Sequence, residues 1–153
     1  MNIDPSGCES ALGPRQQWMQ VLARAGAQLQ VYGDELRQAG HRYIRPPEVG
    51  MVMVRGRMGG SGAPFNLGEM TVTRCVVQLA DGQTGHSYVA GRSKQHAELA
   101  ALADAHLQGP RHAHWMDRLI APLQDSQRQL QAERAAQAAA TKVDFTTLVR
   151  GED

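Results

Sequence analysis

The chain has 153 residues, a formal net charge of +1 and an aromatic content of only 5%. This length fits one domain with its own core, and that core must be mostly aliphatic. A charge this close to zero argues against bulk nucleic-acid binding, which usually requires a dense basic surface.

The cysteines and the first residues indicate a cytoplasmic protein. Cys8 and Cys75 are the only cysteines, too few for a disulfide framework, which fits a reducing compartment. Residues 1–14 lack the basic start and the apolar run of a signal peptide. No apolar stretch approaches the roughly 20 residues of a membrane helix. We expect residues 1–14 to be a variable, disordered leader and residues 15–142 to form the domain.

The domain is predicted to begin with helices. Pro14 suits a first helical turn, where its missing N–H is no loss. Apolar residues then recur at spacings of three and four, which is typical of a helix face: Trp18, Val21, Leu22, Ala25, Leu29, Tyr32 and Leu36. Gly26 falls inside this pattern, so it predicts either two short helices or one bent helix, ending near Gly40.

Strand-like segments follow a break predicted at Pro46-Pro47. Residues 49–58 are apolar on both faces, so we expect a strand that is covered on both sides. Residues 69–80 and 85–90 are predicted to pair as a hairpin that turns at Asp81-Gly82, because these two residue types tolerate positive φ.

The remainder is predicted to be helical. Ser93 suits an N-cap, and Gly109-Pro110 ends that helix. Residues 112–120 form the next one, with Pro122 as a kink or a restart. Residues 124–142 have strong helix propensity but few large apolar side chains, so this helix is either solvated or docked on another surface. The sequence thus predicts an α+β fold: an antiparallel sheet of about four strands flanked by helices, with a long C-terminal helix and tail.

A glycine-rich loop is the first candidate site. It is formed by two arginines and the residues that follow them: Arg55, Arg57, Gly59, Gly60, Ser61 and Gly62. Backbone N–H groups of such a loop can cradle a phosphate, with the arginines supplying charge. No Gly-Lys-Ser/Thr follows, so it is not a P-loop. The alternatives are a flexible connection between strands or a surface that a partner backbone approaches.

A polar helix start is the second candidate site, and its residues are Arg92, Ser93, Lys94, Gln95, His96 and Glu98. Basic side chains and free N–H groups at a helix start attract anions, and a histidine can transfer protons near neutral pH. The alternative is ordinary capping, with His96 packed or hydrogen-bonded.

No catalytic set or metal site emerges from the residue pattern. His106, His112 and His114 lie near a helix end, but their spacing matches no common zinc pattern. No nucleophile stands beside a base and its orienting group. We therefore predict no catalytic residue, no metal and no cofactor bound by this chain alone.

Several of these segments together resemble one family, the PhnG subunit of the bacterial carbon–phosphorus lyase system. The resemblance runs from about Arg15 to Gly151 and is carried by four segments in order: Arg57 to Gly62, Leu67 to Leu79, Gly91 to Glu98, and Val143 to Gly151. Cys75 lies where the family pattern does not require a cysteine.

The resemblance implies an accessory, non-catalytic subunit of a cytoplasmic complex with the H, I and J subunits, and transiently with the L subunit. With H, I and L, such subunits support transfer of the ribose 5-triphosphate of MgATP onto an alkylphosphonate, with release of adenine. The alternative is a stand-alone protein that binds or acts on a phosphorylated ligand. Neither reading involves nucleic acid or a membrane.

The C-terminal segment, residues 143–153, is predicted to dock on a partner. Its apolar and charged residues are Val143, Asp144, Phe145, Leu148, Val149 and Arg150. Apolar side chains at a chain end usually mark a contact surface. The alternative is that the segment folds back onto its own sheet.

Overall fold

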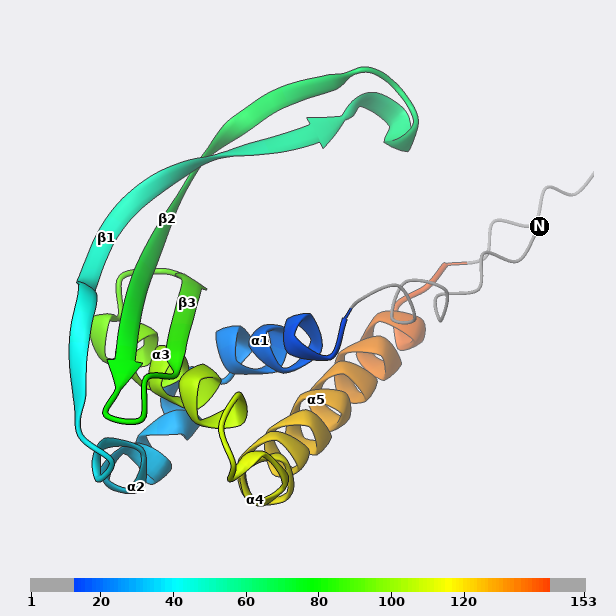
Figure 1. Cartoon of the computed structure of the whole chain (residues 1–153). Coiled ribbons are helices and arrows are strands. Elements are labelled where there is room, and N and C mark those ends of the chain that lie inside the picture. Colours follow the sequence, from blue (N-terminus) through cyan, green and yellow to red (C-terminus); the bar gives the residue numbers. More distant parts are fainter. Residues whose placement is uncertain (1–12, 144–153) are drawn as a thin grey trace, which may run out of the picture.

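The computed structural model describes residues 13–143, and within them helices pack on one face of an antiparallel sheet (Figure 1). The strands are β1 (His41–Arg57), β2 (Pro64–Leu79) and β3 (Thr84–Ala90), in the order β1-β2-β3. The predicted α+β class is confirmed. The described sheet has three strands, one fewer than the predicted number of about four.

The helices are α1 (Pro14–Arg24), α2 (Gly33–Arg37), α3 (Lys94–Leu107), α4 (His112–Trp115) and α5 (Ala121–Ala140). Two short segments with other helical geometries connect them. η2 (Gly26–Tyr32) is a 3₁₀ helix, which is wound more tightly than an α-helix, and η4 (Met116–Ile120) is a π-helix, which is wound more widely. Gly26 has a φ of 55° and ends α1, which confirms the predicted interruption there. No helix among residues 13–143 combines the length and the apolar character that crossing a bilayer requires.

The core forms where α3 lies against the sheet. Almost every residue of α3 is buried, rather than one stripe of it, and Leu99, Leu102 and Leu107 pack with Trp115 and Leu22. Gly85 of β3 permits this close packing, since a Cβ there would collide with the Ala101 carbonyl of α3. The core is mainly aliphatic, as the composition predicted.

The prediction of a break at Pro46-Pro47 was wrong, because β1 continues through both residues. They lie where the register with β2 shifts between Arg45 and Glu48, just after a first shift between Tyr43 and Arg45. β1 is an edge strand, and proline is tolerated at edges and bulges because it has no N–H to offer a ladder.

The strand over residues 49–58 is also not covered on both sides by this chain. Met51 is 68% exposed and Met53 is 53% exposed. β2 starts at Pro64 instead of near Glu69, so β1 and β2 run together well past the end of β3. The two strands leave the body as a curved ribbon, which we call the arm (residues 49–70; Figure 1). The apolar pattern showed that both faces of this strand are apolar. It gave no information on whether the rest of this chain covers them.

The predicted hairpin and the predicted long helix are confirmed. β2 and β3 turn at Asp81-Gly82, where Gly82 alone takes a positive φ, of 93°. The predicted helix at residues 112–120 is split into α4 and η4, and α5 starts beside Pro122. Leu123 is the only buried residue of α5, so this helix is mostly solvated within the described chain.

Candidate functional site

The arm exposes apolar side chains on both of its faces. Val49 pairs with Thr73, which faces the helices, so Val49, Met51 and Met53 continue the helix-facing side of the sheet into the arm. The opposite face carries Met70, which pairs with Val52, and Phe65, which pairs with Gly56. The apolar side chains exposed on the two faces are Val49, Met51, Met53, Phe65 and Met70, whereas Val52 is half-buried.

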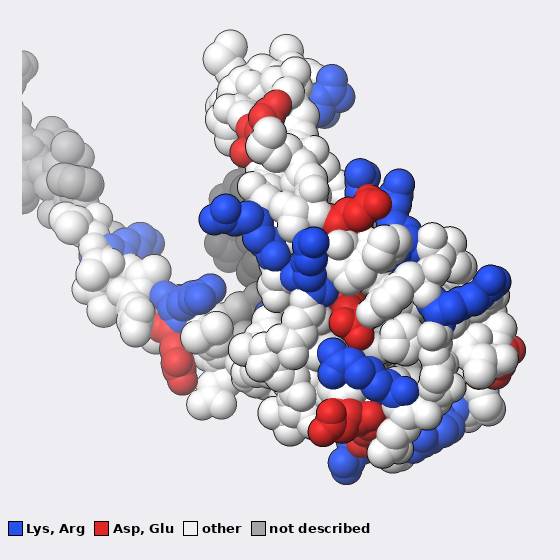
Figure 2. Space-filling view, turned by 90° about the vertical axis from the view of Figure 1, so that its left-hand side faces the viewer, with Lys and Arg blue, Asp and Glu red and all other residues white. Residues whose placement is uncertain are grey.

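The body of the sheet has a different outer face. There Glu48 of β1 is near Arg45 and Arg74, with closest N–O distances of 3.4 and 4.0 Å, and Arg42 bonds Gln78. Figure 2 shows the same contrast: charged side chains are spread over the body, whereas the projecting arm is mostly uncharged. A solvated sheet face is normally polar, so the arm has the composition of a contact surface.

The predicted glycine-rich loop forms the tip of this arm. Gly59 and Gly60 have φ values of 59° and 81°, which L side chains rarely adopt. A Cβ at Gly62 would lie 2.5 Å from the Met58 carbonyl oxygen. The glycines are therefore required by the turn, η3 (Met58–Gly60), and no helix opens after it.

The tip arginines are exposed. An Arg57 N–H donates to the Gly62 carbonyl at 3.4 Å. Neither Arg55 nor Arg57 forms an ion pair with any residue in the described range. The tip thus presents two guanidinium groups without an ion-pair partner among the described residues, and their contact with a phosphate or a partner stays a prediction.

The predicted polar helix start lies in the body, at α3, so the structure does not bring the two candidate sites together (Figure 1). The Ser93 hydroxyl accepts the His96 backbone N–H at 3.2 Å, which confirms the predicted cap. The buried His96 ring donates through Nε2 to the Leu22 carbonyl at 2.8 Å. Gln95 accepts a bond from Gln30. Arg92 and Lys94 are exposed, which leaves them available for a partner or an anion.

Glu98 closes a small cluster between α2 and β1. Its carboxylate accepts from Arg37 at 3.1 Å and lies 4.0 Å from His41. Burial, and then the nearby Glu98 charge, raise the pKa of Tyr43. The same two causes, in the same order, raise the pKa of Cys75 from 9.0 to about 11. The side chains of this cluster link the sheet to α2 and α3, so we interpret them as structural contacts.

Cys75 is therefore expected to be unreactive in the folded chain. A thiol with a pKa of about 11 is almost entirely protonated at pH 8. In a Cys8→Ser variant, Ellman's reagent should react with Cys75 at least about 100-fold more slowly in buffer than in denaturant. Because its folded pKa lies above its unfolded value, Cys75 should also destabilise the fold as pH rises from about 9 toward 11. Equal labelling rates in both conditions would contradict this burial.

A polar cluster around Asp104 was not predicted as a site. This fully buried carboxylate accepts from the Arg15 side chain at 2.8 Å, from the Trp18 ring at 2.9 Å and from the His86 backbone N–H at 2.9 Å. It joins α1, α3 and β3. The only sequence signal was one acid inside an Ala- and Leu-rich helix.

The three histidines do not converge. The His106 ring bonds the Leu36 carbonyl, the His112 ring bonds the Leu107 carbonyl, and the His114 ring bonds Glu35 at 3.2 Å. Bonds from His114 and then Arg118 lower the pKa of Glu35. Among residues 13–143, no three His, Cys, Asp or Glu side chains are grouped so as to hold a metal ion.

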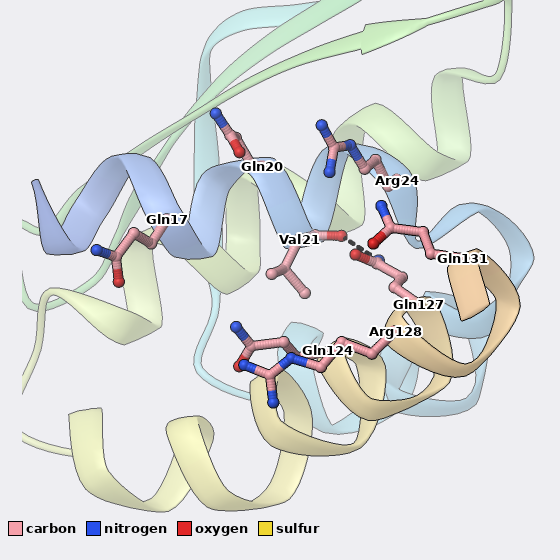
Figure 3. Close-up of a pocket in the computed structure, with 8 residues that line it drawn as sticks. All are labelled: Gln17, Gln20, Val21, Arg24, Gln124, Gln127, Arg128 and Gln131. Carbon is pink, nitrogen blue, oxygen red and sulfur yellow. Dashed lines mark hydrogen bonds between the residues drawn. The ribbon is translucent and has the colours of Figure 1, made fainter. Parts of the chain in front are cut away.

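A groove of about 270 Å³ separates α1 from α5 (Figure 3). Side chains of the two helices face one another across it, and a Gln127 amide donates to the Val21 carbonyl at 2.9 Å. Its lining is amide and guanidinium groups around one valine: Gln17, Gln20, Val21, Arg24, Gln124, Gln127, Arg128 and Gln131. No carboxylate or nucleophile lines it, so it offers contacts and no acid–base chemistry.

The C-terminal docking prediction falls almost wholly outside the described residues. Val143 is described and is 68% exposed. Asp144, Phe145, Leu148, Val149 and Arg150 are not described, nor are residues 1–12.

Comparison with known proteins places the chain in a family. The sequence model of the family described as phosphonate metabolism protein PhnG matches residues 13–151. The chain is also similar to the alpha-D-ribose 1-methylphosphonate 5-triphosphate synthase subunit PhnG of Rhizobium meliloti (strain 1021). The two are 41% identical over 158 aligned residues, which cover 100% of this chain and 99% of the relative. The chain therefore belongs to the PhnG family of phosphonate metabolism proteins.

Proposed function

We propose that this chain is the PhnG-type subunit of an alpha-D-ribose 1-methylphosphonate 5-triphosphate synthase, and that it acts by binding partner subunits in the cytoplasm. The observation that carries the proposal is the 41% identity to such a subunit across the full length of both chains. In this role the chain binds no cofactor of its own, and MgATP and the alkylphosphonate are substrates of the assembled complex.

The arm supports the docking role. A two-stranded ribbon is at best marginally stable in water, yet here it carries exposed apolar side chains on two faces. Its 22 residues, 49–70, match the 20 to 30 residues that each partner contributes to an interface of ordinary size. We propose that the arm contacts the I subunit, and that the H and J subunits, and transiently the L subunit, join the same assembly.

Co-expression tests this assignment directly. A tagged chain is co-expressed with untagged H, I, J and L subunits and purified in two steps. Retention of the I subunit through gel filtration is the expected result. A chain that elutes alone, while the other subunits stay soluble, would overturn the proposal.

The isolated chain is expected to release no adenine from MgATP in the presence of methylphosphonate. No described nucleophile lies beside a base and an orienting group, and the groove between α1 and α5 is lined by amides and guanidiniums. Chromatography of the nucleobase measures the outcome, and the reconstituted complex serves as the positive control. Turnover by the chain alone, or tight ATP binding to it, would favour a stand-alone protein that handles a phosphorylated ligand.

A Gly60→Val substitution is expected to disrupt the tip without unfolding the body. Gly60 has a φ of 81°, which costs a β-branched residue about 1–3 kcal/mol, and nothing else packs on it. The melting temperature of the body should stay within about 2 °C, whereas growth on methylphosphonate as sole phosphorus source should slow markedly. Gly40→Val, which introduces comparable strain at a φ of 65° outside the arm, is the matched control. Normal growth of the Gly60→Val strain would remove the functional role of the tip.

A further inference from the structure

The two edges of the sheet are blocked in the body of the molecule. On β3, the His86 backbone N–H points away from β2 and donates to Asp104 at 2.9 Å, and the Arg15 side chain lies 3.1 Å from the His86 ring. On β1, Pro46 and Pro47 offer no N–H and lie within the register shift between Arg45 and Glu48, and a second shift precedes them at Ile44. Proline, bulges and covering side chains are the usual means of stopping a foreign strand from pairing with an edge.

The same edge of β1 is open in the arm. Residues 49–57 contain no proline, and the one irregularity there places the extra residue, Leu67, on β2. The backbone N–H of His86 points away from β2, and His86 pairs with Val76. The backbone groups of the even-numbered residues of β2 from 68 to 78 therefore point toward β1. The register then directs the backbone groups of alternate β1 residues outward, away from β2: Val49, Met51, Met53, Arg55 and Arg57.

We infer that a partner subunit adds an extended strand to β1 along residues 49–57. This inference rests on the proposed function, because it names how the docked partner is held. Main-chain hydrogen bonds give affinity in such strand addition, and pockets for alternate side chains give specificity. The prolines and register shifts that block the edge of β1 end where the arm begins. The arm is therefore open to pairing with a strand, and not only apolar.

The side chains on this edge define the incoming strand. Val49, Met51 and Met53 share one face and require apolar neighbours across the new ladder. Arg55 and Arg57 follow on that face and have no ion pair among the described residues. The partner strand should therefore carry alternate apolar residues followed by one or two acidic residues. A neutral or basic strand would leave two guanidiniums unpaired in the interface.

Proline and alanine at the same position separate the backbone from the side chain. Met51→Pro and Met53→Pro remove an outward N–H and keep the ladder to β2, whereas Met51→Ala and Met53→Ala remove only side-chain contacts. β1 already accommodates Pro46 and Pro47. In the co-expressed complex, each proline variant should bind the partner at least about tenfold more weakly than its alanine counterpart. Melting of the free chain by circular dichroism verifies that all four variants fold.

The outcomes distinguish this inference from the proposed function. Equal affinities for proline and alanine variants, both weaker than the native chain, would overturn strand addition and leave docking through the arm intact. No binding by the native chain would overturn both.

Amide exchange on the native complex gives a second test that needs no variant. The register directs the N–H groups of Met51, Met53 and Arg55 away from β2, so they should exchange quickly in the free chain. They should slow by at least about tenfold in the complex. Unchanged exchange at these amides would overturn the inference. Arg55→Glu should weaken binding, and the native affinity should fall with added salt, as expected for Arg–carboxylate pairs.

Discussion

The Met51→Asp, Met53→Asp double variant is expected to lose at least about 100-fold in affinity for the partner subunit. Burying one methionine side chain contributes about 1.5–3 kcal/mol, and a carboxylate in its place adds a desolvation penalty. Both side chains are exposed in the free chain, at 68% and 53%. The substitutions should therefore leave the melting temperature of the free chain within about 2 °C. Titration calorimetry or gel filtration of the complex measures the loss.

Val31→Asp is the matched control for this experiment. Val31 is 84% exposed but lies in η2, in the body and away from the arm. The control should bind the partner as the native chain does. If the double variant bound equally well, the arm would not be the docking surface.

Among the substitutions described, Asp104→Ala is expected to lower the free energy of unfolding the most. It strands the Arg15 guanidinium, the buried Trp18 N–H and the His86 backbone N–H, each of which donates to this carboxylate. The Arg15 side chain is 41% exposed and can turn to water, so the loss comes mainly from the Trp18 and His86 N–H groups. Each buried donor left without a partner costs about 1–3 kcal/mol, or about 2–6 kcal/mol for the two. For a chain of this size the melting temperature should fall by roughly 4–24 °C.

Two further variants decide whether the Asp104 network is the cause. Asp104→Asn keeps the shape and can still accept one of the bonds, so it should lose less. Asp125→Ala breaks an exposed contact with Arg128, at 3.7 Å, and should change stability by under about 0.5 kcal/mol. A loss below about 1 kcal/mol for Asp104→Ala would show that the cluster contributes little.

Local features of the fold could be predicted from the sequence because they depend on local chemistry. Gly26, Gly82 and Ser93 act through their own backbone or side chain, and each was placed correctly. The length of β1 and β2 could not be predicted, because Pro46-Pro47 has the local signature of a break. A strand can continue through these two prolines because β1 lies at the edge of the sheet. That edge position is a property of the assembled sheet.

The candidate site shows the same limit. The glycine loop was recognised from its residues, but its position at the tip of an arm depends on the long pairing of β2 with β1, which includes 14 residue pairs. The Asp104 cluster joins residues 89 positions apart, as with Arg15, and no short-range pattern encodes that contact. Family resemblance supplied the function, since no catalytic set could be predicted from the residue pattern of the sequence.

The exposed arm also bears on the fate of a chain that is made without its partners. An orphan copy displays Met51, Met53, Phe65 and Met70 to the cell, beside the open edge of β1 in the arm. Chaperones bind exposed apolar surface of this kind, and open strand edges promote aggregation. Surplus copies should therefore be removed faster than assembled ones, so that the amount of this subunit follows the supply of its partners. The same surface that builds the complex would then set the stoichiometry at which the subunit accumulates.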